Sequence, residues 1–499
     1  MSTSVKRTST YLFVLRIVRM LISVVSVTVT AKYYGVSLER DSWVLAYAVT
    51  TTIIMAVWGP LNEIFRTKFV YIKEQEGKEI ALEKTSSLVG FVFLATLVIG
   101  LILLVFADEL APVLSSSISP QAIPIFTTLL ILLLPNLLLT ELAKLSISVF
   151  NAFDIFYIPE VVSIITGIIG IVINIIFAPI YGIYALVIST YVSAIILFSA
   201  ILYYQKKANL LSIWKHLIRF DIKEAIVFIT FSLPFFLPYF VGQLNFFGEK
   251  FLAGQLGQGQ LSILDYSRQF ISNLQSVLSS VLTTLMVPLL AKAYINKEKE
   301  KFVSIFNDNF IFGFGILTCA FAYLVGATEP LCDFFFNRGK VTPYELDIII
   351  NLTRLFSVSF IGVYFYIIFG MAMLASNQRK QYATLGVATQ VIVFVFNYIG
   401  IVFIKSPYVF AFSYGIGHLL SSIIMMYFFK DLFKRSFIYS KVREFSGMIM
   451  PSIAIIILNS FVEMPSSILQ LLLDSIVMVT ILPFSAILLG YDVMRVLKK

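Results

Sequence analysis

The chain has 499 residues, of which 59% are hydrophobic and only 13% are charged. Because a soluble domain carries about 25% charged residues, this composition excludes an ordinary soluble protein and predicts an all-α polytopic membrane protein. The net charge of +9 then reflects how basic residues are distributed between the two sides of a membrane, and no nucleic-acid partner is expected. With only two cysteines, Cys319 in an apolar run and Cys332 in a loop, we expect no disulfide framework.

The first apolar run, residues 11–30, is long enough to cross a bilayer, which takes roughly 20 apolar residues, yet it contains Arg16 and Arg19. The two arginines are three residues apart and therefore share one face of a helix. An arginine near the middle of a membrane costs about 2.5–3.5 kcal/mol on insertion scales, and it cannot lose its proton. We expect both to face water, a partner group or a bound anion. The alternative is that they extend to the cytoplasmic surface.

Apolar runs of similar length continue along the chain and predict about 14 transmembrane helices. These begin near residues 11, 42, 86, 120, 158, 183, 225, 261, 308, 348, 381, 408, 447 and 467. Loops on the side of the N-terminus hold most of the lysines and arginines, so the positive-inside rule predicts that both termini are cytoplasmic. These basic loops are residues 1–10, 66–84, 206–223, 292–301, 379–380, 430–443 and 495–499.

Two parts of the chain resemble each other at a nearly constant offset. An offset of six spans predicts two lobes of the same orientation, residues 1–210 and 211–440, followed by a helix pair in residues 441–499. Two parallel lobes around a central cavity are typical of transporters that use alternating access. The matched positions are Asp154 with Asn377, Asn174 with Asn397, Gly35 with Gly257 and Pro60 with Pro288.

Charged residues inside predicted spans are the candidates for substrate contact. We interpret them as a net-cationic cavity that suits an anion, because the planar guanidinium group can donate two hydrogen bonds to a phosphate at once. The alternative for Arg268 is an ion pair with Asp265 across one helical turn. Arg354 lies close to the end of its span, which makes it a weaker candidate. The predicted cavity residues are Arg16, Arg19, Asp41, Asp265 and Arg268.

Catalytic chemistry finds little support in the sequence. His216 lies in a predicted cytoplasmic loop and His418 in a span, and neither has a cysteine or carboxylate at metal-ligand spacing. Nothing resembles a phosphate-binding glycine loop. A membrane enzyme such as a glycan polymerase would need a sizeable outer loop, and the predicted outer loops are short. We therefore predict a transporter, with no catalytic residue, no metal site and no cofactor.

Several segments, taken in order, resemble a known family. As a set they are similar to the MurJ/MviN branch of the multidrug/oligosaccharidyl-lipid/polysaccharide exporter superfamily, over nearly the whole chain. Fourteen helices are also typical of that branch. The segments are AKYYGVSLERDSWVLAY at 31–47, QLNFFGEKFLAGQLGQGQLSILDYSRQF at 243–270, VPLLAKAY at 287–294 and FFNRGKVTPYEL at 335–346.

The resemblance implies a flippase in the bacterial cytoplasmic membrane. Its cargo would be an undecaprenyl-pyrophosphate-linked glycan, lipid II or a related lipid-linked oligosaccharide, moved to the outer leaflet for peptidoglycan or cell-surface polysaccharide synthesis. We expect a monomer in the lipid bilayer, with a coupling ion (sodium or proton) or the membrane potential as its energy source. The alternative is a cation-coupled antiporter of drugs or small molecules from the same superfamily.

The resemblance also assigns roles to individual residues. The first-span arginine of the family resembles Arg19, or Arg16 in a neighbouring register. Its aspartate at the start of span 2 resembles Asp41, and its span 8 arginine resembles Arg268. An acidic residue linked to a cation site in some members resembles Glu249, and the residue that accompanies it resembles Asn377.

This chain departs from the family at two positions. A second span 1 arginine of the family falls near Ser26 here, and an arginine of span 2 falls near Ile54. The cavity implied by the resemblance is therefore less basic than in the family. Another polyprenyl-linked glycan, such as an exopolysaccharide or O-antigen unit, stays open as the cargo.

Overall fold

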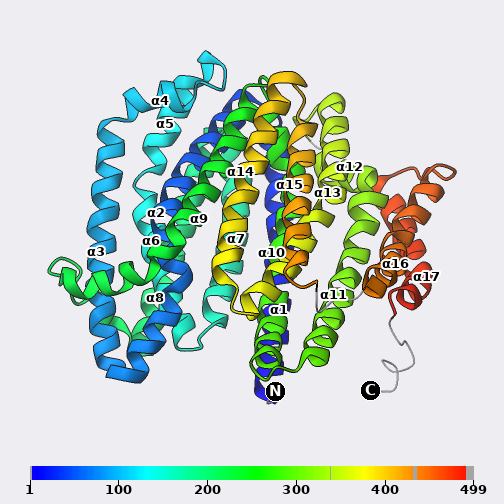
Figure 1. The fold of residues 1–499 in the computed structure, drawn as a ribbon. Coiled ribbons are helices and arrows are strands. Elements are labelled where there is room, and N and C mark those ends of the chain that lie inside the picture. Colours follow the sequence, from blue (N-terminus) through cyan, green and yellow to red (C-terminus); the bar gives the residue numbers. More distant parts are fainter. Residues whose placement is uncertain (1–2, 338, 431–434, 491–499) are drawn as a thin grey trace. The chain divides into compact units, whose positions relative to one another are not determined.

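The computed structural model describes a helical chain whose contacts divide it into two units, Met1–Ser262 and Ile263–Lys499. Every described element is a helix (Figure 1). The described backbone covers residues 3–337, 339–430 and 435–490, without the side chains of residues 3–10, 12–13, 280–281, 284–285 and 435–441. Arg338, and the parts of the predicted basic loops at residues 431–434 and 491–499, lie outside the described residues.

Unit 1 contains nine α-helices and the start of a tenth. Their bounds are α1 Thr3–Tyr34, α2 Leu38–Glu76, α3 Lys78–Val105, α4 Ala107–Leu114, α5 Ile123–Leu133, α6 Asn136–Ala152, α7 Tyr157–Tyr181, α8 Tyr184–Lys207 and α9 Ile222–Gly254, with short η1 Pro120–Ala122 and η2 Leu211–Trp214. Helix α10 (Gln260–Ile295) begins in unit 1 and continues into unit 2. Helix α9 packs against α2 and α3, so unit 1 extends beyond residue 210. The lobe boundaries drawn from the repeat stay a prediction.

Unit 2 contains the rest of α10 and seven further α-helices among the described residues. They are α11 Lys299–Phe321, α12 Thr328–Phe336, α13 Pro343–Ala375, α14 Arg379–Phe403, α15 Tyr408–Tyr427, α16 Arg435–Asn459 and α17 Ser467–Leu488, with the π-helical η3 Ala322–Gly326. Helices α13 and α15 pack along each other, as do α16 and α17. Buried aromatic rings of α11 and α13 form the centre, where the ring centroids of Phe310 and Phe314 lie 4.6 Å apart.

The described helices confirm an all-α polytopic membrane protein with about 14 spans. Twelve helices are long and apolar enough to cross a membrane, and the bent pair of α5 and α6 makes a thirteenth. The remaining expected span, near residue 261, lies in α10, which has 36 residues. Its first half carries Asp265 and Arg268, whose charges make lipid exposure costly.

The bend of 44° between η1–α5 and α6 has an identifiable cause. Pro135 lies at the N-cap of α6. Proline has no N–H to donate to the preceding turn and its ring crowds that turn, so a helix breaks or kinks there. One apolar run therefore forms two helices, which the periodicity of the run did not predict.

Several matched positions of the internal repeat have similar conformations. Asp154 (φ 59°) and Asn377 (φ 60°) each occupy the left-handed region in the turn between two helices, where short polar side chains are tolerated. Gly35 and Gly257 also have positive φ. Asn174 in α7 and Asn397 in α14 are both buried. These matched positions thus share turn conformations and buried amides, and the duplication itself stays a prediction.

Cys332 lies in α12 and is fully buried, rather than in a loop as predicted. Helix α12 is not one of the candidate spans, and burial raises the pKa of the Cys332 thiol to about 12.

Since the thiolate is the reactive form, we expect Cys332 of a Cys319→Ser protein to resist a water-soluble maleimide at pH 8. Full labelling after unfolding in detergent is the control, and rapid labelling of the folded protein would contradict this burial.

Candidate functional site

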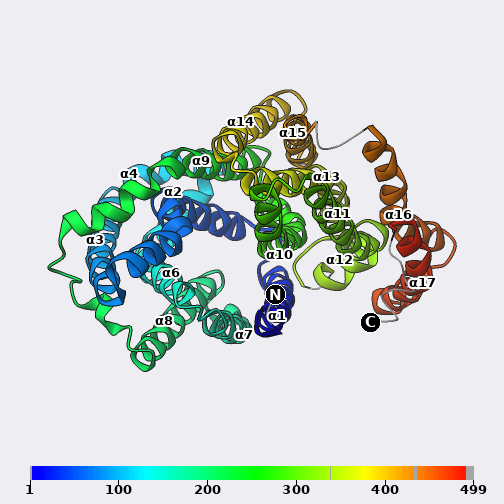
Figure 2. The ribbon, with the colours of Figure 1, turned by 60° about the horizontal axis from the view of Figure 1, so that its bottom comes forward.

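Helices α1 and α7 of unit 1 lie side by side (Figure 2) and are joined by a cluster of three charges. Arg16 Nε lies 3.3 Å from Glu160 Oε1, and an Arg19 guanidinium nitrogen lies 2.9 Å from Glu160 Oε2. The side chain of Glu160 is 13% exposed, against 32% for Arg16 and 45% for Arg19. The predicted arginines therefore share one carboxylate, and the cluster keeps a net charge of +1.

Glu160 was missed by the sequence analysis. It lies in the first turn of α7, where the helix dipole favours an acidic residue. Nothing local connects it to Arg16 and Arg19, because more than 140 residues separate it from them. Its only sequence signal is that it is a carboxylate at the start of an otherwise uncharged span.

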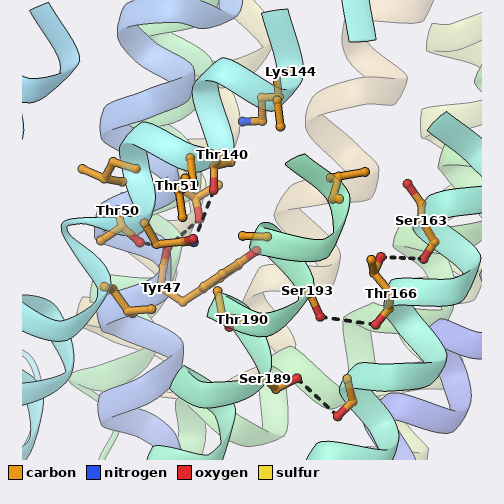
Figure 3. Close-up of a pocket in the computed structure, with 18 of the residues that line it drawn as sticks. Tyr47, Thr50, Thr51, Thr140, Lys144, Ser163, Thr166, Ser189, Thr190 and Ser193 are labelled. Atoms are coloured by element: carbon orange, nitrogen blue, oxygen red, sulfur yellow. Dashed lines mark hydrogen bonds between the residues drawn. The ribbon is translucent and has the colours of Figure 1, made fainter. Parts of the chain in front are cut away.

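A cavity of about 510 Å³ opens inside unit 1 among α1, α2, α5, α6, α7 and α8 (Figure 3). In Figure 3, Tyr47, Thr50 and Thr51 of α2 lie on one side, and Ser163 and Thr166 of α7 lie on the other. Ser163 is one helical turn beyond Glu160, so the charge cluster and the cavity follow each other along α7. We call this cavity the unit 1 pocket.

The unit 1 pocket is lined by apolar side chains and by a polar set that consists of hydroxyl groups, one amide and one basic residue. Lys144 of α6 is the cation among its described lining residues. Ser26 and Ile54, where the resemblance places further family arginines, both line the pocket. The remaining polar lining residues are Tyr47, Thr50, Thr51, Asn136, Thr140, Ser163, Thr166, Ser189, Thr190 and Ser193.

Asp41 occupies a different environment from the one expected of a cavity residue. It is 1% exposed and accepts hydrogen bonds from the backbone N–H groups of Gly259 (2.5 Å) and Ser262 (2.9 Å). The Ser262 hydroxyl donates a third hydrogen bond at 2.6 Å. The first N–H groups of a helix have no partner within the helix, so Asp41 caps the N-terminus of α10 from α2.

The residues of the predicted cation site lie in different units. Glu249 and its neighbour Lys250 are both buried in α9 of unit 1, with Lys250 Nζ 6.0 Å from the ring centre of Phe246. Asn377 lies in unit 2, exposed, in the turn between α13 and α14. A cation site made of Glu249 and Asn377 stays a prediction.

Arg268 of α10 packs against aromatic rings of unit 2. Its guanidinium carbon lies 4.7 Å from the ring centre of Tyr414 and 5.6 Å from that of Phe356. The Tyr414 hydroxyl donates a hydrogen bond to Gln275 Oε1 at 2.5 Å, which holds the ring beside the guanidinium group. Asp265 lies one turn earlier on α10 and is partly exposed. Such a stacked arginine keeps donor groups in a defined plane, which suits recognition of phosphate.

Arg354 lies in α13 and is partly exposed. Its Nε atom is buried and has no hydrogen-bond partner among the described residues. It sits in the same unit as Cys332, whose thiol it influences electrostatically. Arg354 belongs to unit 2, whereas the described lining residues of the unit 1 pocket belong to unit 1.

Comparison with known proteins finds a protein family whose model matches most of the chain. The model of the family "Lipid II flippase MurJ" matches residues 30–487. The lipid II flippase MurJ of Burkholderia cenocepacia is 19% identical over 408 residues, covering 80% of this chain and 78% of the relative. A probable lipid II flippase MurJ of Buchnera aphidicola subsp. Schizaphis graminum is 23% identical over 346 residues, covering 67% and 66%.

Two solved structures share the fold. One described as "Lipid II flippase MurJ, inward closed conformation" has a TM-score of 0.79 at 19% identity, covering 96% of this chain and 98% of that chain. An inward-facing multidrug resistance MATE family transporter of the MOP superfamily has a TM-score of 0.70 at 14% identity, covering 83% and 97%. Because the family model extends over most of its length, the chain belongs to the lipid II flippase MurJ family.

Proposed function

We propose that this chain is a flippase that moves lipid II, or a closely related undecaprenyl-pyrophosphate-linked glycan, from the cytoplasmic to the outer leaflet. The observation that carries the proposal is the family match over residues 30–487. The two arginines of α1 support it, because the shared Glu160 leaves a net positive charge beside a cavity that carries many hydroxyl groups within the spans.

The physical problem of such a cargo is its head group. A pyrophosphate with sugars cannot cross hydrocarbon unaided, since removing charge from water without compensation is very costly. A hydrated, cationic cavity replaces the lost hydration, and guanidinium groups form charge-assisted hydrogen bonds with phosphate oxygens. The polyprenyl tail can stay in the lipid while the head group passes through the protein.

The setting of this activity is part of the proposal. The protein lies in the bacterial cytoplasmic membrane as a multi-pass protein, and we infer cytoplasmic termini from the basic loops. We propose that it acts as a monomer, and that a sodium or proton gradient or the membrane potential supplies the energy. The buried carboxylate of Glu249 is the candidate for a coupling cation.

The test is complementation of a bacterial strain depleted of its own lipid II flippase. The unaltered chain is expected to restore growth and to remove the accumulated lipid-linked intermediate, identified by its mass. An Arg268→Ala variant is expected to lose this activity at normal protein levels, because the stacked guanidinium group is gone. Arg268→Lys keeps the charge without the planar fork and should retain part of the activity. Normal growth with Arg268→Ala would contradict a role for this arginine in transport.

A second candidate function is a cation-coupled drug antiporter, which the likeness to the MATE transporter favours. It requires binding of cationic molecules, and the arginine cluster on α1 works against this by repulsion. Transport of a cationic dye by the purified protein in vesicles, together with failed complementation, would favour it over the flippase.

A further inference from the structure

Six hydroxyl groups of the unit 1 pocket, those of Thr50, Thr51, Thr166, Ser189, Thr190 and Ser193, already have acceptors for their protons. Thr51 donates to the carbonyl oxygen of Tyr47 at 2.6 Å, and Thr190 donates to that of Leu186 at 2.8 Å. Across the pocket, Ser189 donates to the carbonyl oxygen of Gly170 and Ser193 to that of Thr166, both at 3.2 Å. Such bonds to the helix backbone are common for hydroxyl residues. They leave the oxygen lone pairs as the groups available to a ligand.

An amide in the same pocket has the same character. Asn136 donates through Nδ2 to Thr140 Oγ1 at 3.2 Å. Its Oδ1 atom is buried and has no hydrogen-bond partner among the described residues. A buried acceptor without a partner is costly, so a donor from a ligand would stabilise it. The pocket wall is therefore rich in acceptors and selects a ligand that donates hydrogen bonds.

Lys144 is the exception in this wall, because it offers donors and a positive charge. Its Nζ atom lies 3.5 Å from the sulfur of Met55, and it forms no ion pair with the described residues. Glu141, one turn earlier on α6, instead accepts a hydrogen bond from Asn62 Nδ2 at 2.7 Å. The ammonium group thus remains available to an anionic group in the pocket.

We propose that the unit 1 pocket binds the sugar part of the lipid-linked glycan, with an anionic substituent of the glycan at Lys144. Sugar hydroxyl and amide N–H groups can donate hydrogen bonds to the acceptors of the pocket wall. One anionic group can form an ion pair with the ammonium group of Lys144. A volume of about 510 Å³ falls within the roughly 300–1,000 Å³ typical of small-molecule sites. This inference rests on the proposed function and adds which part of the cargo the pocket binds.

The experiment compares two lipids on the purified full-length protein: lipid II and undecaprenyl pyrophosphate, which lacks the sugars. The protein is expected to bind lipid II more tightly. A Thr50→Val/Ser189→Ala/Ser193→Ala variant should lose about tenfold or more in affinity for lipid II, since each lost hydrogen bond is worth about 1 kcal/mol. Its affinity for undecaprenyl pyrophosphate should not change.

Three further variants make the experiment specific. Thr128→Val removes a hydroxyl of the same kind, which donates to the carbonyl oxygen of Pro124 at 2.9 Å but lies outside the pocket, and it should bind both lipids normally. Lys144→Met should lose affinity for lipid II alone, and Lys144→Arg should keep it. Melting temperatures of all variants show that they are folded.

The outcomes separate this inference from the proposed function. If the unaltered protein binds neither lipid, the flippase proposal fails. If it binds both lipids equally, or if the triple variant and Lys144→Met keep the preference for lipid II, the sugar pocket is wrong while the flippase proposal stands. Loss of the preference in these variants, with undecaprenyl pyrophosphate binding intact, is the result we expect.

Discussion

Replacing Asp41 with alanine is expected to destabilise the protein by about 3–5 kcal/mol, because it removes a buried carboxylate that accepts three hydrogen bonds, and hydrogen bonds to charged groups are worth about 1.5–3 kcal/mol each. The side chain is 1% exposed and accepts three hydrogen bonds at the start of α10. Without it, the N–H groups of Gly259 and Ser262 lose their acceptor in a buried place. In a unit of this size, the loss corresponds to a fall in melting temperature of roughly 10 °C.

The measurement is thermal unfolding of the purified protein in detergent. Glu39→Ala is the matched control, since Glu39 lies in the same first turn of α2 but is exposed, and it should shift the melting temperature by no more than about 2 °C. Asp41→Asn keeps one acceptor oxygen, so its melting temperature should lie between those of Asp41→Ala and Glu39→Ala. If Asp41→Ala instead melts like the unaltered protein and only loses transport, Asp41 contacts the substrate and is not a helix cap.

The Arg16→Ala/Arg19→Ala double variant is expected to lose complementation completely while remaining folded. Both arginines are partly exposed, and such ion pairs contribute only about 0–1 kcal/mol to stability. Their removal changes the charge of the cluster from +1 to −1, because Glu160 remains. A net negative cluster repels a pyrophosphate, so we expect its effect on transport to be far larger than its effect on folding.

Three further measurements test this account of the cluster. Adding Glu160→Gln to the double variant removes the unpaired carboxylate and should restore any lost stability, but not transport. Glu160→Gln alone leaves a charge of +2 and should keep binding of undecaprenyl pyrophosphate. Arg66→Ala is the control, because Arg66 forms a 3.0 Å ion pair with Asp154 that is more exposed, at 51% and 78%. Growth of the double variant at normal levels would show that the arginines only bridge α1 to α7.

Much of the fold could be predicted because the membrane imposes simple constraints. A span must be apolar over roughly 20 residues, so the apolar runs gave α7, α8 and α14 directly. The predicted duplication matches positions with special backbone requirements, such as Asp154 and Asn377, which both have positive φ. What the apolar runs could not show was the break at Pro135, where one run forms two helices.

The candidate site was only partly predictable. The charges of Arg16 and Arg19 were conspicuous because a charge inside a span is expensive and must have a reason. Their partner could not be predicted, since Glu160 lies more than 140 residues away and no local sequence pattern connects it to the arginines. Asp41 was placed among the cavity residues by its charge in a predicted span and by resemblance, yet its carboxylate caps α10 some 220 residues later.

The sequence by itself therefore determined the class of protein, the approximate number of spans and the charges within them, because each depends on short-range composition and spacing. Only the tertiary structure decided what those charges contact and where the unit 1 pocket forms. Lys144 is an example: in sequence it is a single lysine in an apolar run, and its importance comes from hydroxyl groups brought around it by α2, α7 and α8. Helix packing decides which distant side chains come into contact, and this cannot be predicted from a local sequence pattern.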